Sequence, residues 1–228
     1  LVNSAAAPRE TYNVPHRIPW HWQVPTYLVA KAIGAGAFIV AAAGVALGLL
    51  PPSPFFTTVA AFISLLFIGL NTGLLVWDLD RPDRFWTILI RPQWKSWLAR
   101  GAFILIGFSG VGGLFFLGHL LGFADLANLL IWPGVVLAIL SAVYTAFLFA
   151  QAEGRDLWQS TLLPAHLFVQ AIMAGAAALL IAAPFFRQTS NMLVWTFGLS
   201  VLVNVLITVG GEFGTPHASQ VATAAAHL

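Results

Sequence analysis

The residues of this chain that could carry proton chemistry are six histidines and eight carboxylates, and most lie near one end of a series of apolar segments. Six residues form this group: His21, Asp78, Asp80, His166, Glu212 and His217. Histidine titrates near neutral pH, and a neighbouring carboxylate can relay its proton. The group therefore favours proton-coupled handling of a hydroxylated or carbonyl ligand.

Other chemistries fit the residues less well. The chain has no His-Glu-x-x-His pattern for a metal, and no apolar segment holds the two histidines that ligate a b-type haem. It has no Gly-x-Ser-x-Gly motif and no cysteine, so nucleophilic hydrolysis and thiolate-bound iron–sulfur clusters are excluded. We expect no metal, haem, iron–sulfur cluster or catalytic centre in this chain.

Polar residues also recur inside the apolar segments. Asn204, Thr208 and Glu212 follow one another at i, i+4 spacing, which on a helix makes one polar row. His166 and Gln170 have the same spacing. Such residues either bond neighbouring helices or form a proton route. Glu212, Asn204, Thr208, His166, His217 and Asp80 are the candidates for proton transfer.

Two further sets of polar residues in the spans have no role that the sequence decides. Lys31 lies about one turn inside the first apolar segment, and its long stem could extend back to the interface or point inward. Tyr144 and Thr145 lie in the middle of the fourth.

An aromatic triplet precedes the first apolar segment. Trp20, His21 and Trp22 could belong to the aromatic belt at a membrane interface. They could equally wall a flat ring such as a quinone, with His21 reaching a ring oxygen.

The elements that position these residues are transmembrane helices. Hydrophobic residues make up 59% of the 228 positions, charged residues 8%, and the mean hydropathy is +0.87; soluble domains carry roughly 25% charged residues. Apolar runs of spanning length occur at 26–50, 56–77, 99–121, 127–150, 162–184 and 190–211. The fold class is all-α, a polytopic transmembrane helix bundle.

The chain divides into an interfacial segment, residues 1–25, and the helical bundle, residues 26–228. Six spans place both ends and the long connection 78–98 on one side, here called the N-side. Most basic residues lie there, including Arg81, Arg84 and Arg91. This charge is either a topology signal, which would put the N-side in the cytoplasm, or a docking face for a partner. A net charge of +2 without a basic stripe excludes nucleic acid.

Three stretches resemble the NrfD/PsrC family, the quinone-reactive membrane subunits of polysulfide-reductase-type complexes. Residues 77–86, WDLDRPDRFW, are similar to the family's Asp-Leu-Gly-Arg-Pro-x-Arg-Phe pattern. The other two are the Trp-His-Trp triplet with the following GAG, and Glu212 with TPH. The chain departs from the pattern at Asp80, where the family has glycine, and at residues 95–97, KSW, which replace a Ser-Pro turn.

The resemblance implies a bacterial inner-membrane subunit, with eight or more helices in the full protein. It implies electron exchange between menaquinone or ubiquinone and a ferredoxin-like iron–sulfur partner, which connects to a redox catalytic subunit of molybdopterin type. His21, Trp20, Trp22 and Asp78 would bind the quinone, and Arg81, Arg84 and Arg91 would face the partner. The alternatives are a proton or solute transporter and a purely structural anchor.

Overall fold

The computed structural model describes residues 22–79, 85–151, 160–188 and 190–212. Within these ranges the chain is helical and contains no strand. The first three spans comprise α1 (Gln23–Phe38) with η2 (Ile39–Ala43) and α2 (Gly44–Ala46), η3 (Phe55–Val59) with α3 (Ala60–Trp77), and α5 (Trp97–Leu120). The other three comprise α7 (Ile131–Ala150), α8 (Leu163–Ala182) with η6 (Ala183–Phe186), and α9 (Asn191–Leu206) with η7 (Ile207–Glu212). The short helices α4 (Phe85–Ile90) and α6 (Ala124–Asn128) lie in connections.

All six predicted spans are confirmed, with small shifts at their ends. The first begins at Gln23 instead of residue 26. Pro25 does not stop it, because a proline in the first turn of a helix removes an N–H that has no partner there. The fourth begins at Ile131 instead of residue 127, because residues 124–128 form the separate helix α6.

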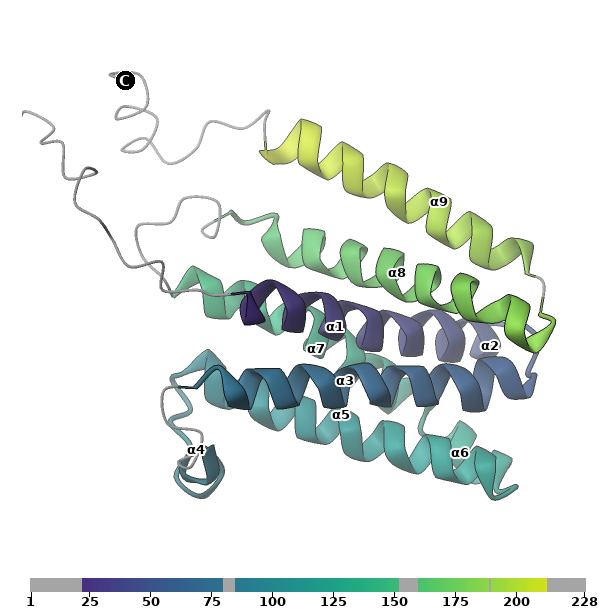
Figure 1. Cartoon of the computed structure of the whole chain (residues 1–228), viewed down its shortest axis with the longest axis horizontal. Helices are drawn as coiled ribbons and strands as arrows, with labels where there is room; N and C mark the ends of the chain where they lie inside the picture. The colour runs from purple at the N-terminus through teal and green to yellow at the C-terminus, as the bar shows by residue number, and fades with distance from the viewer. Residues whose placement is uncertain (1–21, 80–84, 152–159, 189, 213–228) are drawn as a thin grey trace, which may run out of the picture.

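The spans run back and forth along one axis, with α1 at the centre and α9 at the edge (Figure 1). Helix α1 packs against α3, α7 and α8, whereas α9 packs against α8. Buried residues make up 67% of the apolar part of the first span and 11% of that of the sixth. Polar groups on α1 are therefore shielded from lipid by neighbouring helices. Polar groups on α9 are shielded only where they face α8.

Two glycines on α1 allow its neighbours to approach closely. A Cβ on Gly34 would lie 2.9 Å from the Ser64 carbonyl oxygen of α3, and a Cβ on Gly36 would lie 1.7 Å from the Ala171 carbonyl oxygen of α8. Residues two apart on a helix point about 200° apart, so these glycines serve opposite neighbours. Small residues of this kind let the backbones of membrane helices touch, which maximises their van der Waals contact.

The aromatic core lies toward the end opposite the N-side. Phe38 meets Phe108 and Phe115 of α5 edge to face, with ring centroids 5.4 and 5.2 Å apart. Gly134 of α7 leaves room for the Phe38 ring, since a Cβ there would lie 2.6 Å from it. This packing joins α1, α5 and α7 on the side of the polar groups that is farther from the N-side.

Candidate functional site

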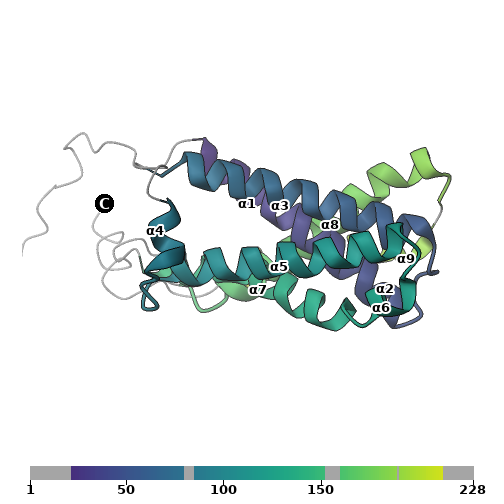
Figure 2. The same cartoon turned by 90° about the horizontal axis from the view of Figure 1, so that it is seen from below.

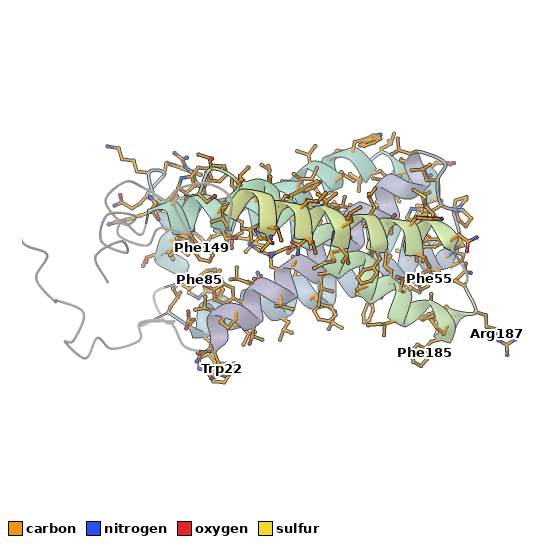
Figure 3. All side chains as sticks on the ribbon, turned by 90° about the horizontal axis from the view of Figure 1, so that it is seen from above. Trp22, Phe55, Phe85, Phe149, Phe185 and Arg187 are labelled. Carbon is orange, nitrogen blue, oxygen red and sulfur yellow. The ribbon has the colours of Figure 1, made fainter. Side chains whose placement is uncertain are left out.

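The start of α1 and the end of α3 meet at the N-side. Trp22 and Trp77 contact each other edge to face, with ring centroids 6.4 Å apart, and both rings are mostly exposed. Asp78 directly follows Trp77, ends α3 and is exposed. Figure 3 shows Trp22, Phe85 and Phe149 at this end, and Phe55, Phe185 and Arg187 at the other. The mouth, defined by Trp22, Trp77 and Asp78, thus joins two segments that sequence analysis placed in the site.

Inward from the mouth, the residues between α1 and α3 are buried. Val24, Tyr27 and Leu74 form a small apolar cluster between α1 and α3. With its amide nitrogen turned toward α1, the fully buried Asn71 side chain donates to the Tyr27 backbone carbonyl at 2.9 Å and accepts from the Thr72 N–H at 3.2 Å. Asn71 therefore links α1 to α3 through a hydrogen bond, and its side chain does not point toward a ligand site.

A line of ionisable groups leads inward from the mouth. Asp78 is exposed at the end of α3, whereas Tyr27 of α1 is 6% exposed and Tyr144 of α7 is 2% exposed. The Lys31 ammonium lies over the Tyr144 ring, 4.7 Å from its centroid. Acidic, phenolic and amine groups therefore follow one another from water to the interior of the bundle.

Lys31 points inward. Its side chain is 2% exposed, and Nζ donates a hydrogen bond to the Thr145 hydroxyl. The interpretation that Lys31 extends back to the interface is therefore wrong. The reason is that α1 is the central helix, so neighbouring helices surround the side chain where an outer helix would leave it facing lipid.

The position of Tyr144 is fixed from the opposite side by α5. A Cβ on Gly101 would lie 2.2 Å from Cε2 of the Tyr144 ring. The absence of a side chain at Gly101 is thus what lets the ring lie flat against α5 and face Lys31.

A second polar group lies between α8 and α9. Nε2 of the buried His166 is 2.9 Å from Oδ1 of Asn204 and 3.0 Å from Nε2 of Gln170. A single ring nitrogen carries either a proton or a lone pair, so it donates to Asn204 in one state and accepts from Gln170 in the other. The three predicted polar residues are brought together in an arrangement that changes its bonding when a proton moves.

The predicted polar row on α9 is only partly regular. The Thr208 hydroxyl donates to the backbone carbonyl of Asn204 at 2.9 Å, so its hydrogen is used within the helix. Residues 207–212 form a π-helix, which has more residues per turn than an α-helix. The backbone at Glu212 therefore does not continue the α-helical register of Asn204 and Thr208.

Several predicted residues fall outside the described part of the chain: Trp20, His21, Asp80, Arg81, Arg84 and His217. Among the other candidates, Arg91 is exposed and directly follows α4. Helix α4 lies at the N-side end of the bundle (Figure 2). The connection that bears it is held by aromatic packing. Trp97 stacks on Phe147 with centroids 4.5 Å apart, and Arg100 Nε donates to the Trp94 carbonyl at 2.6 Å.

Sequence reasoning did not assign Lys31, Tyr144 or Thr145 to the site. Their signals were present, because a lysine in an apolar span and adjacent mid-span polar residues are unusual in lipid. What was missing was the pairing of helices α1 and α7, which periodicity does not give. Within the described residues, no group of three or more His, Cys, Asp or Glu gathers as a metal site would require.

The fold and these buried polar groups define a multi-pass integral membrane protein with ionisable groups concentrated toward one face. Comparison with known proteins is more specific: the family model "Polysulphide reductase, NrfD" matches residues 10–226. The sequence is also 31% identical over 202 residues to the C subunit of polysulfide reductase from Wolinella succinogenes. That alignment covers 80% of this chain and 63% of the relative.

The chain belongs to the NrfD polysulphide reductase family. It is a multi-pass protein of the bacterial inner membrane, and it is similar to a membrane subunit of a reductase complex. The expected family resemblance is confirmed. The matched region spans 63% of the length of the Wolinella relative.

Proposed function

We propose that this chain is the quinone-binding membrane subunit of a multi-subunit oxidoreductase, exchanging electrons between the quinone pool and an iron–sulfur partner at the N-side. The observation that carries the proposal is the change in burial of ionisable groups at the N-side. Asp78 is exposed and follows Trp77, which contacts Trp22, whereas Lys31 is buried against Tyr144 and Thr145. Menaquinone or ubiquinone would supply the redox chemistry, accepting or releasing two electrons and two protons.

Residues at the mouth would supply the aromatic contacts and proton-exchanging groups that the apolar helices lack. Trp22 and Trp77 offer aromatic walls at the mouth, and His21, next to Trp22 in sequence, is the proposed contact to a ring oxygen. Asp78 would exchange protons with water. An uncompensated charge in the bundle would cost several kcal/mol, so a proton must accompany each electron through groups of this kind.

Partner docking is proposed for the connection between α3 and α5. Arg81, Arg84 and Arg91 lie there beside Asp78, Asp80 and Asp83, and the three guanidinium groups would contact the partner. The partner would be a ferredoxin-like iron–sulfur subunit, connected to a redox catalytic subunit of molybdopterin type. Because the chain has no cysteine, any thiolate-bound cluster would belong to that partner.

The second predicted proton group would serve the same function from α8 and α9. His166 and Asn204, with Glu212 and His217 further along, would carry protons between the N-side and the bundle. Thr208, a predicted member of this route, would not take part, because its hydroxyl donates within its own helix. Asp80 would act with Asp78 at the mouth. The proposed route is supported by the two hydrogen-bond distances at His166 Nε2.

The test is quinol-linked electron transfer in the isolated complex. We expect His21→Ala and Asp78→Asn each to lower turnover at least tenfold while the subunits still co-purify. Asp125→Asn, which removes a carboxylate at the other end of the bundle, is the matched control and should leave turnover within a factor of two. Normal turnover in both mouth variants would favour a structural anchor. Proton flux without any quinol dependence would favour a transporter.

A further inference from the structure

A cavity of about 370 Å³ lies between α1, α7 and α8. Its walls include Leu28, Lys31, Ala142, Leu167, Gln170 and Met173. The volume falls within the roughly 300–1,000 Å³ typical of small-molecule sites. Apart from Lys31 and Gln170, every residue in its wall is apolar.

Lys31 reaches this cavity with unused hydrogen-bonding capacity. A protonated lysine carries three N–H donors. One is given to the Thr145 hydroxyl, and the face of the Tyr144 ring lies near the charge. Within the described residues, Lys31 forms no ion pair with a carboxylate. The Lys31 side chain is at least nine-tenths buried, forms part of the cavity wall and lacks an anionic partner in that part of the chain.

Burial makes that situation costly. A charged group in an apolar interior is unfavourable unless a counter-charge or hydrogen-bond acceptor is present. An oxygen atom of a bound ligand would supply the acceptor, and the apolar walls would cover the rest of that ligand. Gln170 on the other wall can donate to a second oxygen through its amide, which is also within bonding distance of His166.

The cavity is accessible from the lipid side of the bundle. Val29 is one of its wall residues and is 59% exposed on the outer surface. A membrane-soluble molecule could therefore enter from the bilayer without passing the mouth.

A second apolar groove among the described residues differs from the cavity because its wall contains no charged side chain. It lies between α8 and α9 and is lined by apolar residues with Thr196 and Ser200 as its only hydroxyls. Both hydroxyls donate to carbonyls of their own helix, at 2.7 and 2.8 Å. That groove offers no charge to a ligand, which makes it a suitable internal control.

We propose that the cavity at Lys31 binds a membrane-soluble molecule with an apolar body and a carbonyl or anionic oxygen, which accepts from Lys31 Nζ and the Gln170 amide. Two sources have this chemistry: a quinone ring and the carboxylate of a free fatty acid. Identification of the ligand as a quinone rests on the proposed function, whereas identification as a fatty acid does not. The site is distinct from the mouth because its wall contains neither Trp22 nor Asp78.

The experiment is a calorimetric titration of the full-length protein in lipid nanodiscs. The probes are a short-chain naphthoquinone and oleate, each alone and in competition with the other. At least one should occupy one site per protein that is lost in the cavity variants, counted apart from any binding at the mouth. Lys31→Met should weaken its binding at least tenfold, because the long apolar side chain keeps the packing and removes the donor.

Ala174→Phe provides a second variant that leaves Lys31 in place. Ala174 is another wall residue, and a phenyl ring there should fill the cavity and abolish binding. Thr196→Phe, which fills the groove between α8 and α9, should leave the affinity unchanged. If Lys31→Met fails to fold, Ala174→Phe against Thr196→Phe decides the question.

The outcomes separate this proposal from the proposed function. Naphthoquinone binding that Lys31→Met or Ala174→Phe removes, without competition by oleate, assigns the cavity to the quinone pool. Competition by oleate for the same site assigns it to acidic amphiphiles in general. Absence of binding by both probes, or binding that Lys31→Met and Ala174→Phe leave unchanged, overturns the proposal. Neither result depends on how Asp78→Asn affects turnover, which is measured at the mouth.

Discussion

The ring of Tyr144 occupies the space that a side chain on Gly101 would need, and the Lys31 amine lies over the same ring. A Cβ on Gly101 would lie 2.2 Å from Cε2 of that ring, and Lys31 Nζ is 4.7 Å from its centroid. Three helices thus meet at one tyrosine. The position of the buried amine depends on a glycine two helices away.

Gly101→Ala should therefore destabilise the protein. The added methyl group must displace the Tyr144 ring, and overpacking of this kind typically costs about 1–3 kcal/mol. The measurement is the thermal unfolding midpoint of the purified protein in detergent. Gly110→Ala, on the same helix and facing open space, is the matched control and should leave the midpoint unchanged or raise it. Equal midpoints for the two variants would refute the role given to Gly101.

The crossing of α1 and α8 should be still less tolerant. A Cβ on Gly36 would lie 1.7 Å from the Ala171 carbonyl oxygen, and one on Gly175 would lie 2.1 Å from the Gly36 carbonyl carbon. Because both contacts are with backbone, the helices must separate. We expect Gly36→Ala to abolish monodisperse protein on size-exclusion chromatography. Gly69→Ala, where a Cβ meets nothing within 4 Å, should elute like the unmodified protein.

The spans could be predicted from the sequence because lipid imposes a simple rule on them. Every backbone N–H and C=O must bond within its own segment, so a long apolar run such as 190–211 can only be a helix. The direction of a polar side chain follows no such rule. Lys31 could have pointed to the interface or inward, and only its place on the central helix α1 decides the matter.

The candidate site was foreseen only where residues adjoin the ends of helices. Trp22 and Asp78 could be assigned to one face of the membrane by counting spans, and the contact of Trp22 with Trp77 agrees with that. The pairing of His166 with Asn204 required knowing that α8 and α9 are neighbours. The fit of Tyr144 against Gly101 required atomic detail. Both depend on contacts between segments far apart in the sequence.

Asn204 and Thr208 should differ in importance, although they are neighbours on one helix face. Under the proposed proton route, Asn204→Leu should lower quinol-linked turnover about tenfold, because it removes the partner of His166 Nε2. Thr208→Val should change turnover less than twofold, since its hydroxyl donates within its own helix. The assay is steady-state turnover of the isolated complex at several pH values. A larger loss in Thr208→Val than in Asn204→Leu would reverse this assignment.

Charge reversal in the connection 78–98 should release the proposed iron–sulfur partner. Changing Arg81 and Arg84 to glutamate replaces two attractive charges by two repulsive ones, and like charges across an interface cost several kcal/mol. The readout is the amount of partner retained when the tagged membrane subunit is purified at low and at 0.5 M salt. We expect the double variant to lose the partner at both salt concentrations. Arg187→Glu, at the other end of the bundle (Figure 3), should retain it as the unmodified protein does. Equal retention by the two variants would remove the docking role from Arg81 and Arg84, and would favour a topology signal as the reason for their charge.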